Sequence, residues 1–221
     1  MANMNLITGY YGENHVTSDD AGTANAAMFG AGQYVMDIGS MFSATVVTNN
    51  KITINDGVLF MQGRQARIEP GTTVDLTIDN GAVGYNRNDL IVARYTRDAS
   101  SGVEQVALVV LKGTSSTETA TDPDYVTADL INGSPSQNDM PLYRIPISGI
   151  NAGSPVQLFS TAQGTLQHIQ NQQNPHHVTA DQVGAAASAH AHRLDDLSNV
   201  HISASTPTSL INGDWYLVKE S

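Results

Sequence analysis

The chain has 221 residues, 40% of them apolar and 14% charged, with a formal net charge of −11 and no cysteine. This length can hold one sizeable domain with appendages, and the acidic balance argues against nonspecific binding to nucleic acid or to an anionic membrane. The lack of cysteine excludes disulfides and zinc–thiolate sites; without a signal-peptide pattern or an apolar run of about 20 residues, we expect a soluble protein made in a cytoplasm.

A short helix is predicted close to the start of the chain. Thr17 or Ser18 can cap its first turn, and the aspartates that follow, Asp19 and Asp20, complement the positive end of the helix dipole. Residues 24–28 are mostly alanine and favour continuation of the helix. The glycines that follow Phe29 are expected to end it.

Strand patterns then dominate. Residues 51–54 (KITI) alternate, and Asn-Asp-Gly joins them to VLFMQG, which predicts a hairpin that turns at Gly57. DLIVARYT and VEQVALVVLK, joined by RDASSG, predict a second hairpin over residues 89–112. Because apolar residues occupy both faces of VALVVL, we expect this strand to be central in its sheet.

A polar surface excursion is expected over residues 114–138, which are rich in Thr, Ser, Asp and Pro. The strand MPLYRIPI follows, and its two prolines, Pro141 and Pro146, predict an edge position. The fold class is therefore mainly β, with an antiparallel β sandwich or barrel over about residues 35–160.

Two arginines stand close together in QGRQARIEP, at Arg64 and Arg67. We expect them to pair with Glu69 or Asp89. A buried arginine that stabilises a turn is favoured here over an anion-binding site.

The composition changes after Phe159 and becomes polar and Gln-rich. We expect three parts, namely a β-rich domain over residues 1–160, a helical or extended stalk with a short helix over 161–205, and a short C-terminal β segment over 206–221. Residues 161–221 hold too few large apolar groups to bury a core within one chain. Three chains winding together would supply one, which predicts an elongated trimeric stalk.

A short pattern occurs twice, as HVTSDDAGTA from His15 and as HVTADQVGAA from His177, and Tyr125 begins a related YVTADL. The pattern is either a repeat or two independently capped helix starts, and the second reading is favoured. The spacing of Thr179 and Gln182 satisfies the capping box, and Pro175 restricts the backbone before it. We expect a hinge or trimer contact formed by Asn174, Pro175, His176, Thr179 and Gln182.

Several segments, in this order and spacing, resemble the N-terminal domain of tail-fibre and baseplate-associated proteins of tailed phages and prophages. They are GYYGENHVTSDDAGTANAAMFGAGQYVMDIG, DGVLFMQGRQARIEPGTTVDLTIDNG, NRNDLIVARYTRD with VALVVLKGT, and MPLYRIPISG, and they cover most of residues 9–160. NPHHVTADQVGA, from Asn174, is similar to the NPHxVTxxQVG module of phage tail-fibre stalks. SAHAHRLDDLSNV and TSLINGDWYLV are similar to segments of the same proteins.

The resemblance implies a homotrimeric virion structural protein, assembled in the bacterial cytoplasm, that links the tail or baseplate to receptor-binding parts. It implies partners among other tail or baseplate proteins, and it does not imply catalysis. One departure is that only about 20 residues follow His201, whereas a complete receptor-binding fibre continues into a large tip domain. The chain is therefore expected to be a short fibre or adaptor, or to work with a separate receptor-binding chain.

His190 and His192 are the candidate metal ligands. On an extended strand, residues i and i+2 face one side, so three chains around an axis would offer six imidazoles to iron or another transition metal. On a helix the two side chains diverge by about 200° and cannot share a metal. Exposed or axis-packed histidines, with no cofactor, are the favoured interpretation.

Trp215 and Tyr216 can stack on a sugar, although packing at a trimer interface is favoured for them. The first alternative function is therefore a carbohydrate-binding receptor-recognition protein of the tail tip, which binds a host-surface receptor. The second is a tail-associated glycan hydrolase. No G-x-S-x-G, Walker A or H-E-x-x-H motif is present, so we expect the chain not to be an enzyme.

Overall fold

The computed structural model describes residues 16–162, 178–179, 181–184, 200–203, 209 and 215–218. The chain divides into two units, residues 1–167 and 168–221, and each is treated by itself. The described residues include no helix long and apolar enough to cross a membrane. Five predicted site residues lie outside the described part, namely Asn174, Pro175, His176, His190 and His192.

The predicted helix is confirmed as α1 (Ser18–Phe29), with Thr17 as its N-cap. The Thr17 hydroxyl accepts a hydrogen bond from the Asp20 amide at 3.1 Å, and the Asp20 carboxylate accepts one from the Thr17 amide at 3.0 Å. This reciprocal pair satisfies two amides that have no partner within the helix. Gly30 ends the helix with a positive φ of 97°.

Replacing Thr17 with alanine is expected to lower the free energy of unfolding by about 1 kcal/mol, because the cap is lost. Thr23→Ala is the matched control, since Thr23 is exposed within the same helix and alanine favours helix there. Urea unfolding followed by circular dichroism compares the two variants. A loss for Thr17→Ala no larger than that for Thr23→Ala would contradict the role of the cap.

The first sheet is organised around β3 (Lys51–Met61). One edge of β3 pairs with β4 (Arg64–Thr77), and the other pairs with β1 (Gln33–Met36) and β2 (Ala44–Thr48), all antiparallel. The short β10 (Thr161–Ala162) pairs in parallel with β1. β4 therefore lies at one edge of this five-stranded sheet.

The predicted hairpin at Gly57 is wrong. KITINDGVLFM forms one continuous strand with a bulge between Asn55 and Gly57. The chain at Phe42 crosses this point, and its amide donates to the Asp56 carbonyl at 3.1 Å. A Cβ on Gly57 would lie 2.7 Å from the Phe42 nitrogen, so Gly57 permits a close approach and not a turn.

The second sheet places β5 (Asn86–Arg97) between β6 (Glu104–Leu111) and β7 (Gln137–Ser148). β8 (Asn151–Ala152) and β9 (Val156–Gln157) pair with the other edge of β7. The predicted hairpin over residues 89–112 is confirmed as β5 and β6.

The positions predicted for two of these strands are wrong. β6 is an edge strand, since it pairs only with β5 among the described residues, whereas β7 has partners along both edges. Pro141 fits inside the sheet because it follows a register shift in the pairing of β5 with β7. Pro146 still uses its carbonyl, which accepts from the Gly153 amide at 2.7 Å.

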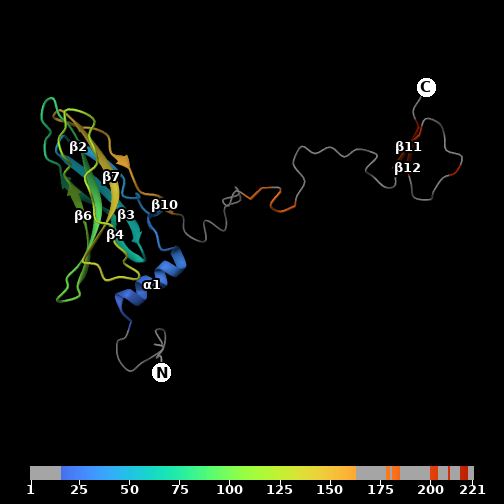
Figure 1. Ribbon diagram of the computed structural model, residues 1–221, viewed down its shortest axis with the longest axis horizontal. Coiled ribbons are helices and arrows are strands. Elements are labelled where there is room, and N and C mark those ends of the chain that lie inside the picture. Colours follow the sequence, from blue (N-terminus) through green and yellow to red (C-terminus); the bar gives the residue numbers. More distant parts are fainter. Residues whose placement is uncertain are drawn as a thin grey trace. The chain divides into compact units, whose positions relative to one another are not determined.

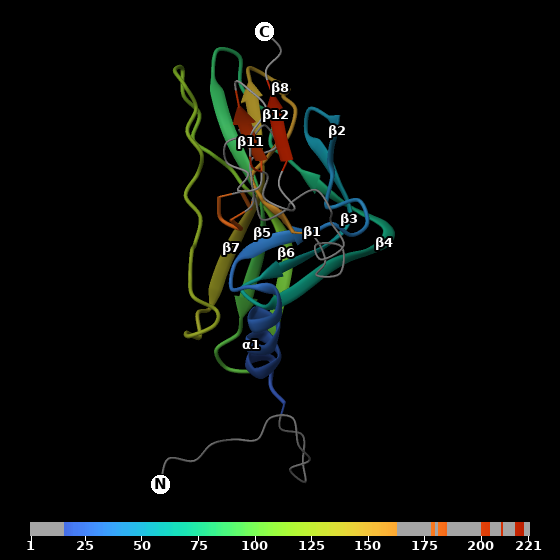
Figure 2. The same ribbon diagram turned by 90° about the vertical axis from the view of Figure 1, so that its right-hand side faces the viewer.

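The two sheets share one apolar core, so the mainly β prediction is confirmed. Together they form a curled antiparallel half-barrel (Figure 1) with α1 near one end (Figure 2). Val35, Ile54, Ile91 and Leu142 are fully buried in this core. The half-barrel is not closed by strand pairing, since β4 and β6 approach each other without backbone hydrogen bonds between them.

The second unit contains one strand pair among its described residues. β11 (Val200–Ser203) runs parallel to β12 (Trp215–Val218), with Val200 opposite Trp215 and His201 opposite Tyr216. The two candidate aromatic residues, Trp215 and Tyr216, thus belong to a strand.

Candidate functional site

Helix α1 docks on the turn between β3 and β4. Gln62 and Gly63 form this turn with positive φ values of 50° and 84°, a conformation typical of two-residue hairpins. The Gly63 carbonyl accepts a hydrogen bond from Asn25 of α1 at 3.0 Å. A Cβ on Gly63 would lie 2.0 Å from the carbonyl oxygen of Gly22, so this contact requires glycine at position 63.

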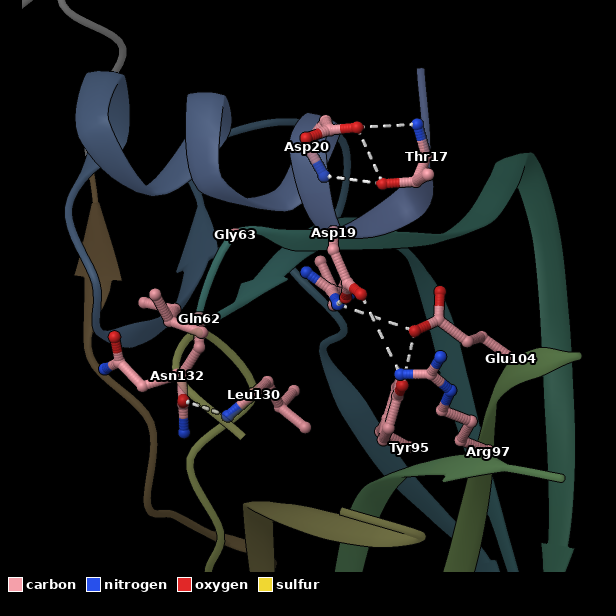
Figure 3. Close-up of polar contacts among 12 residues, drawn as sticks. Thr17, Asp19, Asp20, Gln62, Gly63, Tyr95, Arg97, Glu104, Leu130 and Asn132 are labelled. Carbon is pink, nitrogen blue, oxygen red and sulfur yellow. Dashed lines mark hydrogen bonds and ion pairs between the residues drawn. The ribbon is translucent and has the colours of Figure 1, made fainter. Parts of the chain in front are cut away.

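The same turn is held from its other side by the segment that precedes β7. The Gln62 side chain donates to the Ala128 carbonyl at 2.7 Å and accepts from the Leu130 amide at 2.8 Å. Figure 3 shows Gln62 facing Leu130 below the helix. The turn therefore joins α1 to the rest of the half-barrel.

A buried arginine completes the docking site. Arg64 is 9% exposed; its guanidinium hydrogen-bonds to Asp19 of α1 and lies 3.5 Å from Glu104 of β6. Gly22 makes room for it, since a Cβ there would lie 1.8 Å from Arg64 Nη1. Arg97 adds a longer contact of 3.9 Å to Asp19.

The predicted ion-pair partner is confirmed for Arg67 and is wrong for Arg64. Arg67 pairs with Glu69 at 2.9 Å on the surface, as expected. Arg64 pairs with neither Glu69 nor Asp89, and Asp89 instead holds Arg87 at 2.8 Å. Arg64 does lie beside a turn, as predicted.

Tyr95 and Glu104 form the buried end of the docking site, where the Tyr95 hydroxyl donates to the Glu104 carboxylate (Figure 3). Burial, and then the neighbouring carboxylate, raise the pKa of Tyr95 to about 12. Burial also acts to raise the pKa of Glu104. Hydrogen bonds from Tyr95 and Ser18 and the nearby arginine charges outweigh it, so the net shift of this pKa is downward.

Tyr95→Phe is expected to remove a step near pH 12 from the phenolate absorbance titration. The raised pKa means that the fold favours the neutral phenol, so the stabilisation is complete below the ordinary pKa of about 10. It is lost as the pH rises through about 12. Glu104→Gln should move the step to lower pH while burial keeps it above its ordinary value. An unchanged titration in Tyr95→Phe would contradict the assignment.

A groove follows the opening between β4 and β6, and we call it the seam groove. It consists of two adjoining cavities of about 490 and 200 Å³, which share Ala66, Arg67 and Val106 in their walls. The larger cavity is walled at one end by α1, through residues such as Ser18. The smaller is apolar and reaches the core at Leu59.

The predicted surface excursion is held by specific polar contacts. Asp122 hydrogen-bonds to Arg144 and accepts from Asn88 at 2.9 Å. The VTAD pattern of residues 126–129 differs from the two similar segments at Thr17 and Thr179. Here Asp129, and not Thr127, accepts hydrogen bonds from the amides of residues 131 and 132, both at 2.9 Å. Tyr125 remains half exposed on this segment.

The second unit shows the predicted capping pair. The Thr179 amide donates to the Gln182 side chain at 2.8 Å, and the Gln182 amide donates to the Thr179 hydroxyl at 3.3 Å. The described residues form a turn over 181–184 that ends at Gly184, with a φ of 65°. The same capping chemistry therefore occurs at Thr17 and at Thr179.

The described residues offer structural ion pairs and a groove, and Asp19 and Glu104 both face the same arginine. Among them no cluster of three or more His, Asp or Glu side chains is arranged to hold a metal ion. Fold and site together define a mainly β half-barrel with a docked N-terminal helix. No family model and no curated protein sequence matches the chain.

Proposed function

We propose that the chain is a structural virion protein of a tailed phage or prophage. In this proposal it is a homotrimer in the tail fibre or baseplate that links the tail to receptor-binding parts. The resemblance of residues 9–160 and of NPHHVTADQVGA to such proteins motivates the proposal. The capping pair at Thr179 and Gln182 supports it, because these two described residues of the segment form the capping box that its pattern predicts.

The observation that carries the proposal is the way in which α1 presents its outer surface. Gly22, Asn25 and Asp19 fix the helix on the half-barrel. Met28 on α1 is nevertheless 65% exposed, and Val16 just before the helix is 62% exposed. In this proposal Met28 provides an exposed apolar contact on a firmly docked helix.

Light scattering on the full chain tests the oligomeric state. The expected mass is three times the chain mass of 23.5 kDa, and a monomer with a folded C-terminal region would contradict the trimer. Immunogold labelling of particles produced by the source phage or prophage tests the location. Label on the tail is expected, and its absence from intact particles would contradict a virion protein.

A matched pair of variants tests the apolar surface of α1. Met28→Lys is expected to weaken assembly into trimers or particles, whereas Val83→Lys places the same charge on a loop residue that is 81% exposed. Equal assembly of both variants would remove the support that this surface gives to the proposal.

A further inference from the structure

A separate cavity of about 210 Å³ lies beside β7 and shares no lining residue with the seam groove. Its walls come from β1, from β7, from the segment that precedes β7, and from the residues between β9 and β10. At about 30 Å³ for each water molecule, the cavity holds roughly seven waters. It therefore has room for a single small ring with its substituents.

One wall of this cavity is held firmly against β7. The Val126 carbonyl accepts from the Asp139 amide at 2.8 Å, and the Val126 amide donates to the Asp139 carboxylate at 3.0 Å. The Ala128 amide donates to the Asn138 side chain at 2.8 Å, and both partners on β7 are 0% exposed. The wall is therefore formed before any ligand arrives. Because both backbone groups of Val126 are used, they offer no free edge to an added peptide strand.

The polar groups that line the cavity are side-chain hydroxyls and an amide. Among the described residues, no hydrogen bond satisfies the hydroxyls of Tyr125, Thr127 and Ser160. The Gln33 side chain accepts from Asn138 at 3.4 Å, which leaves its NH₂ group to donate to a ligand. A hydroxyl both donates and accepts, so a ligand rich in hydroxyls satisfies all of these groups.

The cavity also offers apolar surface and no free charge. Tyr125 is 46% exposed and Leu158 is 38% exposed, and both line the cavity. Asp139 is the one charged residue in its walls, and its carboxylate is already held by Arg94 at 2.7 and 2.9 Å. An anion would meet this carboxylate, and a cation would have to compete with Arg94. The favoured ligand is therefore neutral, with one apolar face and a polar rim.

We propose that this cavity binds one ring of a neutral saccharide. The C–H face of a sugar ring covers the exposed Tyr125 and Leu158, and its hydroxyls bond to Thr127, Ser160 and Gln33. Pockets for small ligands commonly combine apolar surface with a few placed polar groups in this way. The inference goes beyond the proposed function and does not depend on it. The site is also distinct from Trp215 and Tyr216, which belong to the second unit.

Saturation-transfer difference NMR on the full chain tests the proposal, with glucose, galactose and N-acetylglucosamine as neutral probes. At least one of them should bind with a dissociation constant on the order of 1 mM, as expected for so small a ligand. Tyr125→Ala should weaken this binding about tenfold, because the aromatic surface is lost. Tyr85→Ala is the matched control, since Tyr85 is 45% exposed and does not line the cavity.

Two further measurements examine the polar rim and the charge. Thr127→Val keeps the shape of the side chain but removes its hydroxyl, and it should also weaken binding. Glucuronate adds a carboxylate to the sugar and should bind more weakly than the neutral probe that binds best. The inference is overturned by no binding of any neutral probe, by equal binding in Tyr125→Ala and Tyr85→Ala, or by tighter binding of glucuronate.

Discussion

Asp139→Asn is expected to lower the free energy of unfolding by about 3 kcal/mol, at the lower end of the cost of breaking a buried ion pair. The Asp139 side chain is 0% exposed, and its two carboxylate oxygens accept from Arg94 at 2.7 and 2.9 Å. It also accepts the Val126 amide at 3.0 Å. Asparagine places an NH₂ donor where the carboxylate accepted hydrogen bonds, which adds to the loss. Arg94 is one quarter exposed and keeps some contact with water, which limits the loss.

Chemical denaturation at fixed chain concentration measures this loss. Asp79→Asn is the matched control, because Asp79 pairs with Lys112 at 2.7 Å while both side chains are more than half exposed. Exposed pairs contribute little, so the control should keep the midpoint of the parent chain. Equal losses in both variants would show that burial of Asp139 has no special weight.

The stabilisation by Asp139 is expected to depend on pH. Burial acts to raise the pKa of Asp139, but the hydrogen bonds from Arg94 and Val126 outweigh it and the net shift is downward. The carboxylate therefore stabilises the fold above its unfolded pKa of about 4, and this stabilisation is lost as the pH falls through the lower folded pKa. The difference in stability between the parent chain and Asp139→Asn should shrink over that acidic range.

Local patterns were sufficient to predict the elements whose partners are close in sequence. The cap at Thr17 needs only Asp20, three residues away, and the hairpin of β5 and β6 needs only its own loop. The predicted turn at Gly57 failed because Asn-Asp-Gly is compatible with both a turn and a bulge. The bulge is fixed by Phe42, which lies in the turn before β2 and whose amide donates to the Asp56 carbonyl.

The candidate site was largely beyond sequence reasoning. Arg64 finds Asp19 and Glu104 at separations of 45 and 40 residues, and no spacing rule connects them. The seam groove was missed because the apolar pattern of VALVVL was interpreted as a central strand. That pattern is equally expected of an edge strand whose free side adjoins an incompletely closed core, as in β6.

Gly63→Ala is expected to destabilise the protein by about 2–5 kcal/mol and to release α1. Two costs combine, because alanine at a φ of 84° costs about 1–2 kcal/mol. Its Cβ would also lie 2.0 Å from the Gly22 carbonyl oxygen, and such overpacking costs about 1–3 kcal/mol. The obstacle is backbone of α1, so relief requires the helix to move.

Gly102→Ala separates the two costs. Gly102 has a similar φ of 70°, and a Cβ there would meet nothing within 4 Å, so this variant carries the backbone cost alone. Chemical denaturation should therefore give Gly63→Ala a lower free energy of unfolding than Gly102→Ala. Hydrogen exchange of the α1 amides should become faster only in Gly63→Ala. Equal stability of the two variants, with α1 equally protected in both, would mean that the contact between Gly22 and Gly63 does not hold the helix. The docking of α1 would then depend on Arg64 and Asn25.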